Sequence, residues 1–429
     1  MQILIAAILV ITVILDIKLS GRYLMVPSLN QIFIFFIFFV YCIPFFALYS
    51  EPLTAISMLG QLSEYEVQNL MNYLFSFVLF YGIFYLLLKG YLPTKTFYKL
   101  DKRPSEKRLV VIFLIALIVK YLYLGTGLGF SPSVVIDRFF DPRSYTYIKQ
   151  GTGYINFLNS ASLHTLLFYC IYSLVQSKRS LGLLQIIIII LSLVLVLGGG
   201  SKQNFMWGLF YWIIISQKVR PRFFRSLTSY FKNALNLVIL GLGSLAGILL
   251  MFAPSSQSSR NALEILTDYQ QEAFYGAKVL SDFTYKFEYT LIGVYDHFIS
   301  IVPRGIWPGK PIVGFYDRFW RPVYQTDTVE YHTSTYGILS EAFFMFGSLG
   351  PLIYGLFSAL LIVKLERAYA ETKRISTIFV VAFMAINFYF IVRAGYYAFQ
   401  FWYILIVICI GLLLLKSTWS KNIGERLNV

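Results

Sequence analysis

The sequence contains few charged residues. Only 13% of its 429 residues are Asp, Glu, Lys or Arg, against roughly a quarter in an ordinary soluble domain. Hydrophobic residues make up 58% of the chain, and Phe, Tyr and Trp together make up 18%. A single water-facing core cannot hide this much apolar surface, so most of it must face lipid. The composition excludes a soluble globular protein and indicates an integral membrane protein.

Cysteine is also scarce. The three cysteines, Cys42, Cys170 and Cys409, lie inside long apolar runs, which argues against a disulfide framework and against a thiolate metal site. The sequence shows no P-loop, no zinc-binding spacing and no internal repeat. Its net charge of +15 comes from basic residues that are scattered between apolar segments. This distribution is typical of the loops of a membrane protein, whereas a nucleic-acid-binding protein concentrates its basic residues in one polar domain. We expect no metal and no cofactor.

Long apolar runs occupy most of the chain. A helix needs about 20 mainly apolar residues to cross the hydrocarbon layer, and this criterion, relaxed for a few short runs, predicts an all-α polytopic protein with about eleven transmembrane helices. Their ranges are Gln2–Ile17, Gln31–Leu48, Leu70–Leu88, Leu109–Gly125, Ile155–Val175, Leu181–Leu197, Phe205–Ser216, Leu235–Phe252, Tyr336–Val363, Thr377–Val392 and Ala398–Leu415. One membrane domain therefore comprises residues 1–252 with eight spans, a large loop at 253–335, and residues 336–429 with three spans and a tail.

Lys and Arg are unevenly distributed between alternate connections. One set of connections carries 23 of the 36 basic residues, and seven of the remaining 13 lie in the long loop. Short loops retain basic residues on the cytoplasmic side, whereas long loops cross largely regardless of charge. This bias places the C-terminus in the cytoplasm and, with eleven spans, the N-terminus and the long loop outside. The first span has no basic segment before it and no cleavage site after it, so we expect it to be retained.

The long loop contains segments with a structure of their own. Asn261–Leu280 has helical character, and Phe283–Val302 spaces apolar residues among polar ones as an interfacial helix does. The next nine residues, Pro303–Pro311, contain three prolines and two glycines, which predicts a fixed, irregular turn. The loop is therefore expected to hold short helices rather than disordered chain.

We single out three of the ionisable residues that lie inside or beside the predicted spans. Such a group must find a partner or a water-filled cavity, which makes it a functional candidate. Lys202 is either a functional cation or a lysine that extends to the surface from a tight hairpin. Arg393 is either functional or an anchor at the membrane interface. Glu341 is either an acid/base group or half of an ion pair with an arginine.

The long loop also supplies cations and flat aromatic faces. These are Arg260, Arg304, Lys310, Trp307, Tyr316 and Trp320. Guanidinium groups bind phosphate oxygens through paired hydrogen bonds, and lysine binds them as a point charge. Aromatic faces suit sugar rings, although Arg and Trp also anchor loops at the headgroup layer. Together with Lys202 and Arg393 on the same predicted side, the set suggests an outward-facing site for an anionic, lipid-linked substrate.

Two histidines differ in their expected roles. His332 lies just before the ninth predicted span and is either a proton acceptor near neutral pH or an ordinary loop residue. His164 lies inside the fifth span beside Ser162 and Thr165, which favours a hydrogen bond between packed helices.

Two segments carry a resemblance to a known family. Val302–Pro311, followed about 30 residues later by Ser340–Gly350, resembles the Wzy-type oligosaccharide repeat-unit polymerases, also called O-antigen or capsule polymerases. That family has ten to fourteen spans and a large extracytoplasmic loop in its second half. The resemblance in architecture covers most of the chain, whereas the resemblance in sequence rests on these two short motifs.

The resemblance implies an enzyme without a metal. It would join repeat units carried on undecaprenyl pyrophosphate at the outer face of the bacterial cytoplasmic membrane, with a chain-length regulator and a flippase as partners. The family's prolyl-arginine segment maps onto Arg304 and Lys310, and its glutamate maps onto Glu341. Lys202 stands where the family more usually has arginine, and a lysine binds phosphate as a point charge rather than through paired hydrogen bonds.

The required chemistry agrees with the residues singled out. A sugar hydroxyl attacks the anomeric carbon of a second glycan, and negative charge grows on the leaving lipid pyrophosphate. Fixed cations stabilise that charge more in the transition state than in the ground state; the candidates are Lys202, Arg260, Arg304, Lys310 and Arg393. Glu341 or His332 is the candidate base, and Trp307, Tyr316 and Trp320 are the candidate sugar contacts.

Two alternatives share the expected architecture. A flippase for the same lipid-linked glycans is expected to carry basic residues in a central cavity and to show two related halves, and the sequence shows no obvious halves. An O-antigen ligase would use the same chemistry on a different acceptor, and only the loop motif separates it from a polymerase.

Overall fold

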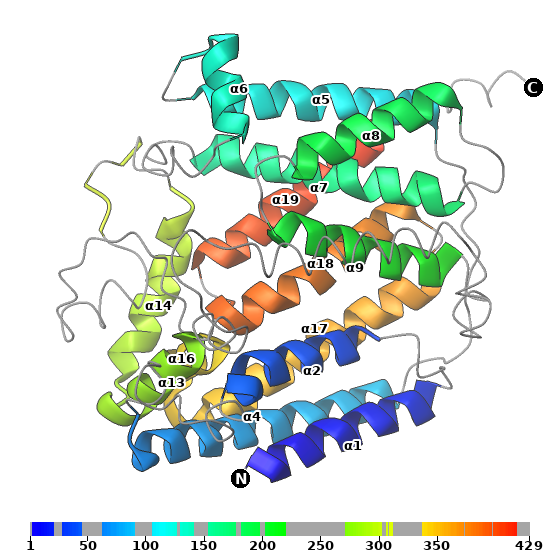
Figure 1. Ribbon diagram of the computed structural model, residues 1–429. Helices are drawn as coiled ribbons and strands as arrows, with labels where there is room; N and C mark the ends of the chain where they lie inside the picture. The colour runs from blue at the N-terminus through cyan, green and yellow to red at the C-terminus, as the bar shows by residue number, and fades with distance from the viewer. Residues whose placement is uncertain are drawn as a thin grey trace, which may run out of the picture. The chain divides into compact units, whose positions relative to one another are not determined.

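The computed structural model in Figure 1 is helical throughout the part of the chain it describes. The described residues are 2–20, 28–44, 62–90, 105–126, 129–140, 153–176, 182–197, 202–219, 271–302, 306–307, 309–311, 337–372, 374–396 and 398–417. No strand occurs among them. The expected all-α class is confirmed for these residues.

The α-helices are α1 (Gln2–Ser20), α2 (Leu29–Ile37), α4 (Glu64–Lys89), α5 (Glu106–Gly125), α6 (Pro132–Phe140), α7 (Gly153–Gln176), α8 (Leu183–Leu197), α9 (Lys202–Val219), α13 (Gln271–Asp282), α14 (Phe287–Ser300), α16 (Gly337–Phe346), α17 (Gly350–Glu371), α18 (Ile375–Ala394) and α19 (Ala398–Ser417). A π-helical segment, η1 (Phe38–Cys42), continues α2, and a 3-10 turn, η7 (Gly347–Leu349), joins α16 to α17.

Among the described residues, five stretches of helix are long and apolar enough to cross a membrane. They are α4, α5, residues Ile155–Gln176 of α7, the joined α16 and α17, and α18. Three shorter apolar helices occupy Leu29–Cys42, Leu183–Val196 and Phe401–Leu415. These helices support a membrane protein, while the count of eleven spans and the orientation of the termini stay predictions. The expected span Leu235–Phe252 lies outside the described residues.

The expected single span Tyr336–Val363 is interrupted in the structure. Its first part, α16, ends at Phe346, and α17 continues after the 3-10 turn as far as Glu371. Gly347 takes a φ of 57°, in the left-handed region that glycine adopts without steric cost. A Cβ atom at this position would collide with the ring of Tyr285. Glycine at position 347 therefore permits both the turn and the close packing.

The described helices belong to two compact units. One consists of Met1–Thr96, Met251–Ala368 and Asn387–Trp402, and the other of Phe97–Leu250, Tyr369–Ile386 and Tyr403–Val429. We call them unit 1 and unit 2 and describe each by itself. The predicted division at residues 252 and 335 stays a prediction.

In unit 1, α4 supplies the central stripe of the core. It begins at a capping box in which Ser63 and Glu66 exchange hydrogen bonds between side chain and backbone. Leu70, Leu74, Phe77 and Tyr81 are fully buried, and their spacing of three to four residues places them on one side of the helix. α4 packs against α1 and α13.

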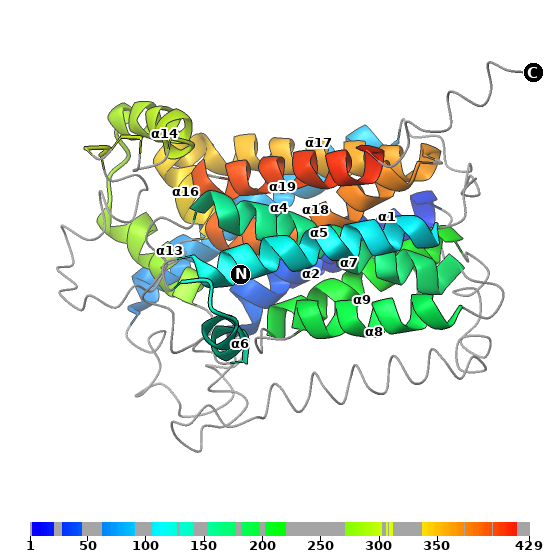
Figure 2. The ribbon, with the colours of Figure 1, turned by 90° about the horizontal axis from the view of Figure 1, so that it is seen from above.

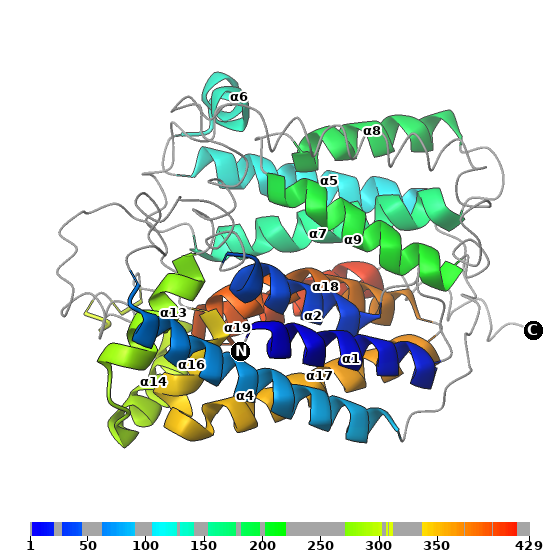
Figure 3. The same ribbon diagram turned by 60° about the horizontal axis from the view of Figure 1, so that its bottom comes forward.

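Two helices of unit 1 lie within the predicted long loop. α13 packs against α4 and α16, and α14 packs against α16. α14 runs across the direction of α4 and α17 in both Figure 1 and Figure 3. The sequence predicted helical structure in this part of the loop, and α13 and α14 confirm it, while the side of the membrane on which they lie stays a prediction.

In unit 2, α5, α7, α8 and α9 run in a common direction (Figure 2), and α7 packs against the other three. α7 is buried on most sides, which is why its polar side chains are hydrogen-bonded internally. His164 Nδ1 lies 2.8 Å from the Tyr211 hydroxyl of α9. This contact confirms the expected role of His164 as a hydrogen-bonding group between packed helices.

Candidate functional site

The carboxyl end of α18 carries an ion pair that involves Arg393. The Arg393 Nε and Nη2 atoms lie 2.6 Å and 2.5 Å from Oε1 of Glu272 in α13. Nη1 donates to the Tyr389 hydroxyl at 3.2 Å, one turn earlier in α18. The Glu272 side chain is 1% exposed and that of Arg393 is 24% exposed. The acidic partner is thus buried, whereas the Arg393 side chain is partly exposed.

Glu341 lies in α16 and is nearly fully buried. Its Oε1 atom accepts a hydrogen bond of 2.5 Å from the hydroxyl of Tyr354 in α17. The Tyr354 ring lies 5.9 Å from that of Tyr396, whose hydroxyl is 2.9 Å from Oγ of Ser358. A buried carboxylate requires such hydrogen bonds, because desolvation without them is costly. The interruption between α16 and α17 lets both helices contribute to one polar cluster.

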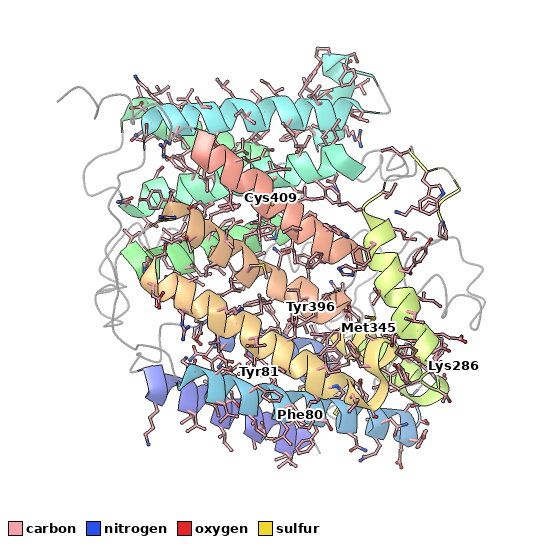
Figure 4. The ribbon with its side chains drawn as sticks, turned by 180° about the vertical axis from the view of Figure 1, so that it is seen from behind. Phe80, Tyr81, Lys286, Met345, Tyr396 and Cys409 are labelled. Atoms are coloured by element: carbon pink, nitrogen blue, oxygen red, sulfur yellow. The ribbon has the colours of Figure 1, made fainter. Side chains whose placement is uncertain are left out.

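Gly395 lies at the contact between Glu341 and the end of α18 that carries Arg393. Gly395 follows Arg393 by two residues and adopts a φ of 80°. A Cβ atom built on it would overlap the Oε2 atom of Glu341, so the Glu341 carboxylate packs directly on the backbone at Gly395. Figure 4 shows the neighbouring Tyr396 between the helices of this region.

Tyr41 completes the site and was not anticipated from the sequence. Its hydroxyl donates to the carbonyl oxygen of Val392 at 3.4 Å, and the residue is fully buried in η1. A Cβ atom at Gly337 would meet the Tyr41 hydroxyl and the Cβ atom of Glu272. Tyr41 therefore lies where α13, α16 and α18 converge. A π-helical segment within a helix is often found at functional sites.

The predicted loop cation Lys310 is engaged by backbone in the structure. Its ammonium group donates to the carbonyl oxygens of Ser300 at 3.1 Å and Val302 at 2.8 Å. Ser300 is the last residue of α14 and Val302 lies two residues beyond it, at the end of the helix where a cation also interacts favourably with the helix dipole. The structure thus gives Lys310 a structural role at the end of α14, and its contact with pyrophosphate stays a prediction.

The structure describes the remaining predicted site residues only in part or not at all. Trp307 is 38% exposed. Lys202 is the first residue of α9, in unit 2, and its side chain lies outside the described part of the chain. The same holds for five further residues, Arg260, Arg304, Tyr316, Trp320 and His332. Their proposed contacts with substrate stay predictions.

A second buried ionic cluster lies in unit 1 and was also missed. Lys89, the last residue of α4, pairs with Asp16 of α1 and with Glu366 of α17, the latter at 3.3 Å. The Tyr85 hydroxyl lies 2.9 Å from Asp16 and 3.0 Å from Glu366. The Ser28 hydroxyl, at the start of α2, donates to Asp16 at 2.5 Å. We call these five residues the Lys89 cluster.

The described residues contain no group of three or more His, Cys, Asp or Glu that could hold a metal ion. Among them the Arg393–Glu341 site combines a partly exposed cation, buried carboxylates and tyrosine hydroxyls within one unit. Such a set can bind an anionic group and can accept a proton. The chain matches no family model, and comparisons with curated proteins and with solved structures find no match either.

Proposed function

We propose that this chain is a membrane glycosyltransferase that joins undecaprenyl-pyrophosphate-linked oligosaccharide units into a polysaccharide at the outer face of the bacterial cytoplasmic membrane. The observation that carries the proposal is the packing of the Glu341 carboxylate against Gly395, two residues from Arg393. The proposal takes the Glu341 carboxylate as the base and Arg393 as the group that binds the anion. The two motifs that resemble the Wzy-type polymerases add independent support.

Arg393 suits the pyrophosphate leaving group. Its hydrogen bonds to Glu272 and Tyr389 use three of the five N–H groups of the guanidinium. The other two can donate to a phosphate oxygen from the exposed quarter of the side chain. As the bond between the anomeric carbon and the phosphate oxygen breaks, the charge that grows on that oxygen is stabilised by this fixed cation.

Glu341 suits the acceptor sugar. The acceptor hydroxyl forms a new bond to the anomeric carbon and gives its proton to the carboxylate, while undecaprenyl pyrophosphate leaves with the electrons of the broken bond. Tyr354 and the backbone at Gly395 hold the carboxylate in position.

The test replaces each group in a strain that depends on this gene for surface glycan. Glu341→Gln and Arg393→Ala are expected to reduce the glycan to a single repeat unit, resolved by gel electrophoresis. Glu371→Gln and Arg374→Ala are the matched controls, because these exposed residues lie at the far end of α17 and at the start of α18. Glycan of wild-type length in both site variants, at normal membrane abundance, would refute the assignment.

A transporter for the same lipid-linked glycans is the second candidate. The Lys89 cluster favours it, because ionisable residues buried between membrane helices often mark ion or substrate pathways. The same gene deletion separates the two functions. Loss of a transporter abolishes surface glycan altogether and leaves lipid-linked units on the cytoplasmic side, whereas loss of a polymerase leaves single units at the surface.

A further inference from the structure

The helix α14 exposes an uninterrupted apolar stripe. Phe287 is 66% exposed, Leu291 56%, Val294 46% and Phe298 67%. Steps of three to four residues place these four side chains on one side of the helix. Water-facing helices seldom present four large apolar side chains in a row, so this stripe requires an apolar environment.

The opposite side of α14 is fixed to unit 1. Gly293, Asp296 and Ile299 are buried. The Tyr289 ring packs edge-on against Phe344 of α16 at 5.7 Å between centroids, and the Thr290 hydroxyl donates to the carbonyl oxygen of Met345 at 2.5 Å. The stripe is therefore the outward face of an anchored helix.

The end of α14 is held as well. The indole Nε1 atom of Trp402, in α19, donates to the carbonyl oxygen of His297 at 2.7 Å, and the Lys310 ammonium group binds the carbonyls of Ser300 and Val302. Contacts at the middle and at the end of α14 thus fix its rotation, and with it the direction in which the stripe faces.

The direction of α14 identifies the apolar environment. The helix lies across the direction of α4 and α17 (Figures 1 and 3), both of which are candidate membrane spans. If those helices cross a bilayer, α14 lies parallel to its surface, as interfacial helices do. Leu349, in the 3-10 turn that joins α16 to α17, is 60% exposed and is a further large apolar side chain outside the core of unit 1.

The residues around the stripe are those of a membrane interface. Lys286 is exposed immediately before α14 (Figure 4), and Ile306 and Trp307 are exposed after it. Basic residues favour lipid headgroups, and tryptophan is enriched at the boundary between headgroups and acyl chains. This flanking pattern favours a lipid surface over a protein partner.

We propose that α14 is an interfacial helix whose stripe, Phe287, Leu291, Val294 and Phe298, inserts into the boundary between headgroups and acyl chains of the bilayer. This inference goes beyond the proposed function and does not depend on it. It assigns to the predicted loop a surface that binds lipid directly, and this surface holds α13 and α16, with Glu272 and Glu341, at a fixed depth relative to the membrane surface.

The experiment uses single cysteines in the full-length protein in vesicles of phosphatidylcholine and phosphatidylglycerol. Cys409→Ser removes the exposed native thiol, while Cys42 and Cys170 are buried. Leu291→Cys and Phe298→Cys, each labelled with bimane, report on the stripe, and Val294→Cys replaces either variant if it fails to fold. Thr284→Cys and Glu288→Cys are the controls, because both residues are exposed and lie outside the stripe.

A phosphatidylcholine with a spin label high on its acyl chain is expected to quench the stripe labels at least about twofold more than the control labels. Aqueous iodide is expected to show the reverse order. Equal iodide quenching at all four positions would overturn the proposal, because the stripe would then face water. Stripe labels shielded from both quenchers would overturn it too, since a protein partner or a second copy would then cover the stripe.

Discussion

At the scale of single residues, Gly395 controls the distance between the Glu341 carboxylate and the end of α18. Its φ of 80° is costly for any residue with a Cβ atom, and the space beside it is filled by the carboxylate. Gly90 differs from Gly395 both in the space beside it and in its backbone conformation. A Cβ atom there would make ordinary contacts of 3.7 Å with the carbonyl oxygens of Leu86 and Leu87, in right-handed helical backbone.

Gly395→Ala is expected to destabilise the protein by at least about 1–2 kcal/mol because of the left-handed backbone alone. It should also displace Glu341 and lower polymerising activity further than the loss of folded protein explains. Thermal unfolding in detergent, monitored by size-exclusion chromatography, measures the first effect, and glycan length measures the second. Gly90→Ala is the control and should change neither. Equal behaviour of the two variants would contradict the packing of the Glu341 carboxylate against Gly395.

Tyr354→Phe tests the hydrogen bond to Glu341. The change removes only the hydroxyl that donates to Oε1 and leaves a buried carboxylate with one donor fewer, at a cost of about 1–3 kcal/mol. We expect a lower midpoint of thermal unfolding and shorter glycan. Tyr65→Phe, at a residue that is 66% exposed, is the control. A midpoint equal to that of the wild type would show that the Tyr354 hydroxyl contributes nothing.

At the scale of helices, the Lys89 cluster joins the ends of α1, α4 and α17 to the start of α2. The Lys89 ammonium group pairs with two buried carboxylates, those of Asp16 and Glu366. The hydroxyl groups of Tyr85 and Ser28 form hydrogen bonds with oxygen atoms of the same carboxylates. Removal of one member of a buried charged network leaves its partners desolvated without compensation. The cluster therefore links these helix ends through charge rather than through apolar packing.

Lys89→Met is expected to destabilise the protein by about 3–5 kcal/mol, because Asp16 and Glu366 then repel each other in a buried site. Asp16→Asn added to Lys89→Met should restore part of the loss, and a double-mutant cycle measures how much. Lys107→Met, at an exposed residue in the first turn of α5, is the control. Additive effects of the two changes would show that Lys89 and Asp16 are not coupled.

Lys310→Met distinguishes a structural role from a catalytic one. If the ammonium group only caps α14, the variant should lose about 0.3–1 kcal/mol of stability and retain long glycan at normal abundance. A pyrophosphate contact predicts short glycan at unchanged stability. We expect the first result, which thermal unfolding and glycan analysis of the same variant would establish.

At the scale of the whole molecule, membrane topology decides whether the site can reach the proposed lipid-linked substrate. A polymerase of lipid-linked units on the outer face requires α13, α14 and the Arg393–Glu341 site on that face. The predicted orientation, with seven basic residues in one long outer loop and the C-terminus inside, satisfies this requirement.

A membrane-impermeant maleimide tests this orientation in intact cells. In the Cys409→Ser background, Glu288→Cys should be labelled directly, because residue 288 is exposed on α14, whereas Arg426→Cys near the C-terminus should be labelled only after permeabilisation. The reverse pattern would place the site on the cytoplasmic face. That result would contradict the polymerase reading while leaving the contact of α14 with lipid intact.

The sequence by itself determined the class of protein. The apolar composition, the length of the apolar runs and the spacing of apolar residues in α14 can all be read along the chain. They therefore predict helices and lipid contact without knowledge of the fold. Glu341 and Arg393 were recognisable for the same reason, since a charge inside or beside an apolar run is costly in lipid. The sequence did not single out Asp16, Lys89 and Glu366. All three lie at or just beyond the ends of predicted spans, and charged residues are expected there because the connecting segments begin at those points.

Only the tertiary structure decided how these charges are paired. Glu272, the partner of Arg393, is 121 residues distant in the chain, and Glu366 is 277 residues from Lys89. The interruption at Gly347, which allows α16 and α17 to share one polar cluster, depends on Tyr285 packing against that glycine. Pairings of this kind arise from the packing of helices against one another, and the pattern of apolar residues within each helix leaves several such packings open.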